Sequence, residues 1–141
     1  MSEIQHSRIT IPALLISVRL EEADGHAQAV VDKPNRAALI RWPNQTVIVD
    51  HAAGLFANLH RCREGMTAYL RRDGKREKWV CCRVQTGHIR LSPRCLFDEN
   101  WQPVSRQNDG GLTIYTCKGE AFGGVQDVTL TYWRPAQRKR G

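Results

Sequence analysis

Hydrophobic and polar residues alternate along much of this chain, and this pattern predicts β-strands. Every second residue from 14 to 20 is apolar, which favours a first strand with one buried face. Asp24-Gly25 is a two-residue hairpin signal, and pairing about it places Val18 opposite Val31. Residues 37–42 and 46–49 predict two more strands.

A helix is predicted where the spacing between apolar residues changes from every second residue to every third or fourth. Apolar residues recur at helical spacing at four positions: Leu55, Phe56, Leu59 and Cys62. Asp50 is a suitable N-cap, and Gly65 a suitable C-terminal stop. We therefore expect one amphipathic helix over residues 51–64.

A second hairpin signal, Asp73-Gly74, lies between strands predicted over residues 66–72 and 75–84. Its register places Arg71 opposite Arg76, Tyr69 opposite Lys78 and Ala68 opposite Trp79. The face that suits a core then carries Met66, Ala68, Leu70, Trp79 and Cys81. The opposite face carries Thr67, Tyr69, Arg71, Arg76 and Lys78.

The C-terminal part predicts a strand at residues 87–91, a structured connection over 92–107 and a closing antiparallel pair at 112–117 and 127–133. Val128, Leu130 and Tyr132 share one face of the last strand. Trp133 falls on the other face, where we expect it to be exposed. Phe122 is expected at the exposed tip of the connecting loop.

These elements predict an α+β fold that is predominantly antiparallel β. We expect a barrel or strongly curved sheet of about seven or eight short strands with one amphipathic helix near residues 51–64. A five-stranded barrel of the oligonucleotide-binding (OB) type is an architectural analogy, because it also places a helix between its third and fourth strands. The expected organisation is a flexible N-terminus at 1–8, a single β-rich domain at 9–135 and a basic disordered tail at 136–141.

Positive charge is concentrated in one part of the chain. The net charge is +7, and residues 61–94 contain ten basic residues against three acidic ones, which equals the whole excess. Arginine predominates there, and a guanidinium binds phosphate bidentately and stacks on bases. We therefore predict a non-enzymatic nucleic-acid-binding protein, for DNA or RNA, that contacts mainly the phosphate backbone. The candidate contact residues are Tyr69, Arg71, Arg72, Lys75, Arg76, Lys78, Arg83, Arg90 and the tail residues Arg138, Lys139 and Arg140.

Two other functions are compatible with the same residues. A basic interaction or inhibitor factor would dock its charged face on an acidic protein partner. A small metal-free ribonuclease would need His88, Arg90 and Tyr69 to converge. The sequence contains no catalytic motif, so no catalytic residue is predicted, and the oligomeric state stays open.

Cysteine usage indicates reduced thiols and no cofactor. The five cysteines are odd in number, and Cys81 and Cys82 are adjacent, unlike a disulfide framework. The nearest approach to a zinc site is His60, Cys62 and Cys95, but no Cys-x-x-Cys pair is present and Cys62 fits a buried thiol better. No signal peptide or membrane-spanning stretch is apparent, so we expect a cytoplasmic protein without a membrane partner.

Overall fold

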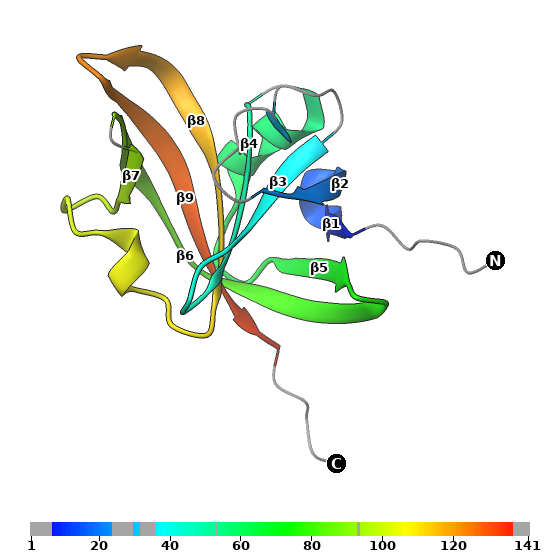
Figure 1. Cartoon of the computed structure of the whole chain (residues 1–141). Coiled ribbons are helices and arrows are strands. Elements are labelled where there is room, and N and C mark those ends of the chain that lie inside the picture. Colours follow the sequence, from blue (N-terminus) through cyan, green and yellow to red (C-terminus); the bar gives the residue numbers. More distant parts are fainter. Residues whose placement is uncertain (1–6, 24–29, 32–35, 53, 93, 137–141) are drawn as a thin grey trace.

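The computed structural model describes residues 7–23, 30–31, 36–52, 54–92 and 94–136. Within them the chain forms nine strands and three short 3-10 helices (Figure 1). The strands are β1 (Arg8–Ile11), β2 (Ile16–Glu22), β3 (Arg36–Arg41), β4 (Thr46–Asp50), β5 (Thr67–Arg72), β6 (Lys75–Leu91), β7 (Arg94–Phe97), β8 (Leu112–Phe122) and β9 (Val125–Pro135). The 3-10 helices are η1 (Pro12–Leu14), η2 (Gly54–Arg61) and η3 (Val104–Arg106). None of the described helices is long and apolar enough to cross a membrane.

Eight strands close into a barrel, which confirms the first of the two predicted forms, a barrel or a strongly curved sheet. Around the barrel the order is β5-β1-β2-β3-β4-β8-β9-β6, and β6 pairs back onto β5; β7 is added to the outer side of β6. Most neighbours are antiparallel, but β2 pairs with β3 and β4 pairs with β8 in parallel. The barrel therefore has eight strands, whereas a barrel of the OB type has five.

The predicted hairpin at Asp73-Gly74 is confirmed residue by residue. β5 and β6 pair Arg71 with Arg76, Tyr69 with Lys78 and Ala68 with Trp79. This register follows from residues next to one another in the chain, because a two-residue turn leaves only one way to pair the flanking strands. The pair predicted at residues 112–117 and 127–133 is also present, as the first part of β8 paired with the central part of β9.

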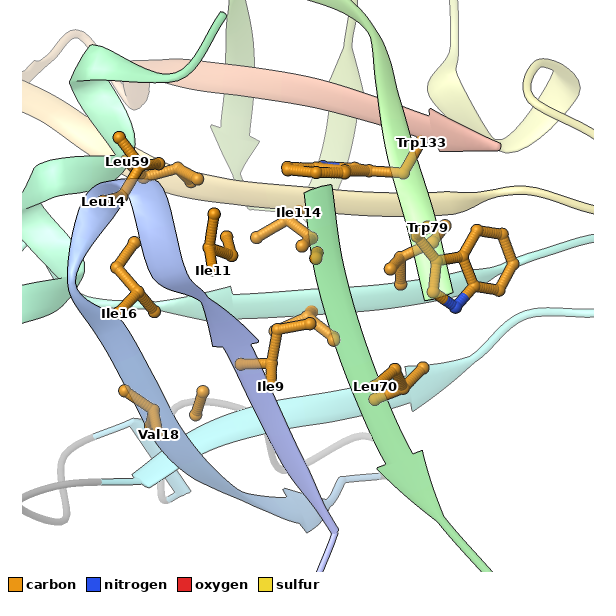
Figure 2. Close-up of a cluster of buried hydrophobic side chains, with 14 of the residues drawn as sticks. Ile9, Ile11, Leu14, Ile16, Val18, Leu59, Leu70, Trp79, Ile114 and Trp133 are labelled. Carbon is orange, nitrogen blue, oxygen red and sulfur yellow. The ribbon is translucent and has the colours of Figure 1, made fainter. Parts of the chain in front are cut away.

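The barrel interior is filled by apolar side chains from almost every strand (Figure 2). Trp133 lies among Ile114, Ile11 and Leu59 in the close-up, with Leu70 and Ile9 further along the interior. The 3-10 helix η2 adds two of these residues, Phe56 and Leu59, both buried. Apolar side chains at every third position, ending with Cys62, suit the three-residue turn of a 3-10 helix.

A second apolar cluster covers the outside of one half of the barrel. It includes Val49, Leu96, Tyr115, Leu130 and Tyr132. Strand β7 and helix η3 lie over this outer face, and Val30 and Val31 also belong to the cluster. Parts of strands β4, β8 and β9 are therefore buried on both faces, which gives them continuous runs of buried residues, threonines included, instead of alternating buried and exposed positions.

Four sequence-based expectations need correction. Trp133 is fully buried, because the face opposite Leu130 points into the barrel and does not meet solvent. The expected helix over 51–64 is shorter, of the 3-10 type, and preceded by Asp50 as the last residue of β4. Arg8, assigned to the flexible N-terminus, belongs to β1.

The fourth correction concerns the first hairpin. Val18 pairs with Ile9 of β1, and Val31 has helical backbone, so the two do not face each other. Because β2 and β3 are parallel, the chain must cross from one end of the barrel to the other between them. Asp24-Gly25 itself lies outside the described residues, as do residues 1–6 and 137–141.

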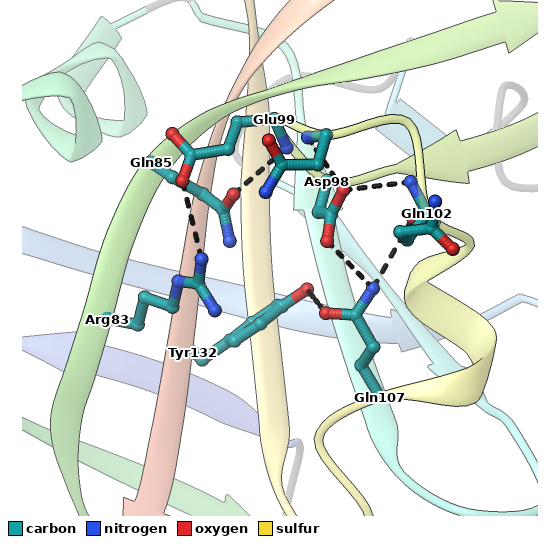
Figure 3. A network of polar contacts seen from close by, with 8 residues as sticks. Arg83, Gln85, Asp98, Glu99, Gln102, Gln107 and Tyr132 are labelled. Carbon is teal, nitrogen blue, oxygen red and sulfur yellow. Dashed lines mark hydrogen bonds and ion pairs between the residues drawn. The ribbon is translucent and has the colours of Figure 1, made fainter.

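A polar network holds the connection between β7 and β8 against the barrel (Figure 3). The buried carboxylate of Asp98 accepts hydrogen bonds from the backbone N–H groups of Asn100 and Gln102 and from Gln107 Nε2. Burial acts to raise the pKa of Asp98, but these hydrogen bonds to the charged form outweigh it and lower the pKa. Tyr132 of β9 donates to Gln107 Oε1 at 3.2 Å, which joins the connection to the outer face of the sheet.

Candidate active site

The parallel pairing of β4 with β8 brings a histidine and a cysteine together. The last pair on this seam joins Asp50 to Thr116, whose Oγ1 donates to the Asp50 carbonyl at 2.7 Å. His51 and Cys117 each follow one residue later. Adjacent strands lie about 4.8 Å apart, so the seam places these two residues side by side.

Strand β7 adds an arginine to the same place. Arg94 begins β7, which pairs with the end of β6 through Leu91. A cavity of about 250 Å³, here called the Cys117 cavity, opens at this point on the outer face of the barrel. Its lining residues are Val31, Val49, Asp50, His51, Ile89, Leu91, Arg94, Cys117 and Gln126.

The charge of Arg94 acts directly on the thiol. Burial raises the pKa of Cys117, and the nearby Arg94 guanidinium opposes this rise. A cysteine beside a cation and a histidine, in a cavity that solvent can enter, is the arrangement in which a thiolate becomes a nucleophile. The structural cysteines Cys62 and Cys81 differ, because they are buried in the barrel interior with their Sγ atoms 3.7 Å apart.

Asp50 also lines the cavity, and its pKa, like that of Cys117, is shifted. Burial raises its pKa to about 6, although the backbone N–H of His51, 2.8 Å from Asp50 Oδ1, and the His51 side chain both act to lower it. Part of the cavity lining is apolar, with side chains of Val49, Ile89 and Leu91. The site therefore combines an apolar part of the lining with a few titratable groups.

A second cavity continues from the first along the outer face of the barrel. It has a volume of about 260 Å³ and shares Ile89 and Arg94 with the Cys117 cavity. Its other lining residues are Ile40, Trp42, Cys95, Leu96, Ser105 and Tyr115. Together the two cavities form a mainly apolar groove with the reactive residues at one end.

The sequence-predicted contact residues fall into separate regions. Tyr69, Arg71 and Arg76 line one pocket on the outer face of β5 and β6. Lys78 lies opposite Tyr69, and Lys75 follows the turn. Arg72 does not line this pocket. Its guanidinium forms an ion pair with Glu77 at 3.3 Å and donates a hydrogen bond to Thr46 Oγ1 at 2.9 Å.

The remaining cations lie elsewhere or outside the described residues. Arg83 pairs with Glu99 at 3.3 Å on the far part of β6. The Arg90 guanidinium lies 5.5 Å from the ring centre of Phe97 on β7. Arg138, Lys139 and Arg140 fall outside the described residues. The charge of residues 61–94 thus does not form one continuous surface.

The residues proposed for a ribonuclease do not converge. His88 pairs with Asp127 at 2.8 Å and stacks on Trp101, with ring centres 4.2 Å apart. Tyr69 lies opposite Lys78, ten residues earlier on β6, which is roughly 30 Å along an extended strand. His60, Cys62 and Cys95 also stay apart: His60 contacts Thr129 and Cys62 contacts Cys81. In the part of the chain that is described, no three His, Cys, Asp or Glu side chains gather as a metal site would require.

Sequence reasoning missed all three residues that meet at the Cys117 cavity. The sequence predicts His51 within a helix and Cys117 within a strand as a reduced thiol, and it counts Arg94 only among the basic residues 61–94. The available signal was that two apolar β-branched segments end in Asp-His and Thr-Cys. That signal has meaning only if the two strands are parallel neighbours, which their separation in the chain conceals.

Comparison with solved structures places this fold among known enzymes. Sortase E1 from Streptomyces coelicolor, solved with a tripeptide in its active site, aligns with a TM-score of 0.66 and 13% identity over 94% of this chain and 88% of its own. A sortase D5 transpeptidase from Clostridium perfringens gives 0.66 and 14% over 96% and 83%. A lid mutant of sortase A from Corynebacterium diphtheriae gives 0.62 and 15% over 94% and 71%. No family model and no curated protein matches the sequence.

This likeness overturns the predicted function. The prediction of a non-enzymatic nucleic-acid-binding protein, and with it the alternatives of an acidic-partner factor and a ribonuclease, is wrong. The solved structures that share this barrel are transpeptidases instead. DNA or RNA is accordingly not the main partner. The chain has the sortase-like β-barrel fold, with a cysteine, a histidine and an arginine in one cavity on its outer face.

Proposed function

We propose that this protein is a cysteine transpeptidase that transfers the acyl group of a peptide through a thioester on Cys117. One observation carries the proposal: Cys117, His51 and Arg94 come from three separate strand ends and line a single cavity. Convergence of a thiol, an imidazole and a guanidinium supplies a nucleophile, a proton carrier and an anion stabiliser. The shared fold with the sortase D5 transpeptidase supports the same conclusion.

The first half of the reaction forms the acyl-enzyme. The Cys117 thiol loses its proton to His51, and its sulfur attacks the carbonyl carbon of a substrate peptide bond. Arg94 stabilises the negative charge that develops on the carbonyl oxygen. The carbon–nitrogen bond then breaks, and the leaving amine takes the proton from His51.

The second half releases the acyl group. An incoming amine attacks the thioester carbonyl, gives a proton to His51 and forms a new amide bond. The carbon–sulfur bond breaks, and the thiolate recovers the proton from His51. Water in place of the amine would give hydrolysis by the same steps. The adjoining apolar cavity that contains Trp42 would hold an apolar part of the acyl donor.

Trapping the thioester tests this function. The protein is incubated with a mixed peptide library and an amine acceptor, and intact-mass and peptide mass spectrometry locate acyl adducts. We expect adducts on Cys117 and new amide products, and a loss of about a thousandfold or more in turnover for Cys117→Ala. For His51→Gln and Arg94→Gln the expected losses are about a hundredfold or more.

The control is Cys82→Ala, which removes an exposed thiol on β6 that does not line the cavity. It should retain full turnover. If Cys117→Ala and wild-type protein give equal product, or if adducts form equally on Cys82, the assignment of Cys117 as nucleophile is wrong.

A further inference from the structure

Across neighbouring strands on the side of the barrel away from Cys117, a row of arginines lies in register: Arg36, Arg19, Arg8, Arg71 and Arg76, of which the last three line one pocket. Arg8 of β1 lies directly opposite Arg71 of β5, and Arg71 lies directly opposite Arg76 of β6. Residues opposite each other on paired strands project from the same face. Here that face is the outer one, since Ile9 and Leu70, their neighbours in sequence, are buried in the interior.

These side chains enclose a pocket of about 280 Å³, here called the Arg71 pocket. Its lining residues are Arg8, Thr10, Pro12, Tyr69, Arg71 and Arg76, and no carboxylate is among the described ones. Two of the arginines are held in place by neighbours. Arg8 Nη1 donates to Ser17 Oγ at 3.0 Å, and the Arg76 guanidinium lies 4.1 Å above the ring centre of Tyr69.

The row brings like charges close together, and a bound anion would reduce their mutual repulsion. Opposite residues on paired strands have Cβ atoms about 5 Å apart, and like charges on directly opposite residues destabilise a sheet. Arg71 lies between Arg8 and Arg76, and within the described residues its side chain makes no hydrogen bond or ion pair. Its guanidinium is therefore available to a ligand, and the ligand would relieve repulsion on both sides.

We propose that the Arg71 pocket binds a phosphate group. Guanidinium forks match the oxygen pairs of a tetrahedral oxyanion, and a phosphate dianion balances three positive charges better than one carboxylate does. The pocket lies near the lower limit of small-molecule sites, so it has room for the phosphate and a small attached group beside the Tyr69 ring. The pocket is thus a local site for one phosphate, unlike the extended nucleic-acid surface predicted from sequence, because Arg72, Lys75 and Lys78 do not line it.

The Arg71 pocket is independent of the proposed transpeptidase site. In the closed order of eight strands, β1 lies four strands from β8, on the opposite side of the barrel. No residue lines both the Arg71 pocket and the Cys117 cavity. Failure of one proposal therefore leaves the other standing.

Isothermal titration with inorganic pyrophosphate, and with acetate at the same ionic strength, tests the pocket in the full-length protein. We expect saturable pyrophosphate binding, no saturable acetate binding, and affinity at least about tenfold weaker in Arg71→Gln. The matched control is Lys75→Gln, which removes the same charge from the same hairpin outside the pocket and should change affinity by less than about twofold. Arg8→Gln is a second variant that reaches the pocket from another strand and should behave like Arg71→Gln.

A second experiment identifies the source of the phosphate. Flotation with phosphatidylglycerol vesicles, against phosphatidylcholine vesicles, detects a lipid headgroup. Arg71-dependent flotation that pyrophosphate competes away assigns the pocket to a headgroup, whereas pyrophosphate binding without flotation assigns it to a soluble phosphate ester. Equal losses in Arg71→Gln and Lys75→Gln, or no saturable binding in either experiment, would overturn the proposal.

Discussion

At the scale of single residues, the reactivity of Cys117 depends on two opposing influences. Burial raises the pKa of the Cys117 thiol, and the Arg94 guanidinium acts to lower this pKa by favouring the thiolate. In wild-type protein, alkylation of Cys117 should therefore accelerate as the pH rises through the alkaline range. Cys117 differs from a typical exposed thiol in this respect, because its pKa is raised.

Removing the arginine should suppress this reactivity further. In Arg94→Gln the pKa of Cys117 should rise again, because only burial still acts on it strongly. We expect iodoacetamide to modify Cys117 roughly three- to tenfold more slowly at neutral pH, with the two proteins converging at high pH. Mass spectrometry of the Cys117 peptide measures the rate, and Cys82 in the same sample is the internal control. Equal rates at neutral pH would show that Arg94 does not act on the thiol.

Asp50 predicts a pH-dependent effect on stability. Its pKa is raised from 3.8 to about 6 in the folded protein, so the fold favours the neutral carboxyl. Protonation of Asp50 stabilises the folded state. This stabilisation is fully present at pH values below the pKa of Asp50 in the unfolded chain, and it is lost as the pH rises through about 6. Asp50→Asn imitates the neutral form and can still accept the hydrogen bond from the His51 backbone N–H.

We therefore expect Asp50→Asn to melt at a higher temperature than wild type at about pH 8 and at nearly the same temperature below about pH 4. Thermal unfolding followed by circular dichroism at several pH values gives the comparison. Glu120→Gln makes the same charge change at an exposed position of β8 and should show no such trend. A difference that grows toward acid pH would have the wrong sign for this explanation.

At the scale of elements, the position of Arg94 depends on how closely β7 approaches β6. Gly87 of β6 lies where a Cβ atom would be 2.6 Å from the Phe97 backbone oxygen and 3.1 Å from Leu130 Cδ2. The absence of a side chain there lets the two strands pair. Arg94 is the first residue of β7, so the close approach of β7 to β6 also fixes the position of Arg94 in the Cys117 cavity.

Gly87→Ala should consequently affect both stability and activity. We expect a loss of about 1–3 kcal/mol in the free energy of unfolding, because the new methyl group meets backbone that cannot rotate away. Urea denaturation measures the loss, and turnover should fall as β7 shifts. Lys75→Ala, at the exposed turn of the same strand, should leave both unchanged within about 0.5 kcal/mol. Unchanged stability in Gly87→Ala would mean that β7 is free to move outward.

At the scale of the whole molecule, half of the barrel has two buried faces. Leu130 lies under the outer elements and Trp133 points into the interior, and both are fully buried. The outer elements thus have two roles: they cover the sheet, and their edges form the walls of the groove that leads to Cys117.

Substitutions on the two faces should therefore be comparably costly. We expect Leu130→Ala to lose about 2–5 kcal/mol of unfolding free energy and Trp133→Ala about 3–5 kcal/mol. Chemical denaturation monitored by circular dichroism gives both values. Phe122→Ala, at a side chain that is 90% exposed, is the control and should change stability by no more than about 0.5 kcal/mol. If one face of this part of the sheet were exposed to solvent, one of the two substitutions would instead cause little loss of stability, and that result would contradict the prediction.

Local sequence determined the parts of this fold that depend on neighbouring residues. The β5–β6 hairpin and its register, including Arg71 opposite Arg76, could be predicted because a two-residue turn and alternating side chains suffice. The β8–β9 pair could be predicted for a similar reason, since its members are consecutive strands. Charge counts located the arginines, but they could not show which arginines share a pocket.

Only the tertiary structure decided where the candidate active site lies. Asp50 and Thr116 are 66 residues apart, and their hydrogen bond marks a parallel seam that no local turn encodes. Arg8 reaches the Arg71 pocket, and Arg94 reaches Cys117, because barrel closure and the addition of β7 bring distant strands into contact. Long-range pairing depends on the free energy of the whole barrel, whereas a hairpin depends on a few adjacent residues. The chemistry of this protein therefore appears only when the strands are assembled.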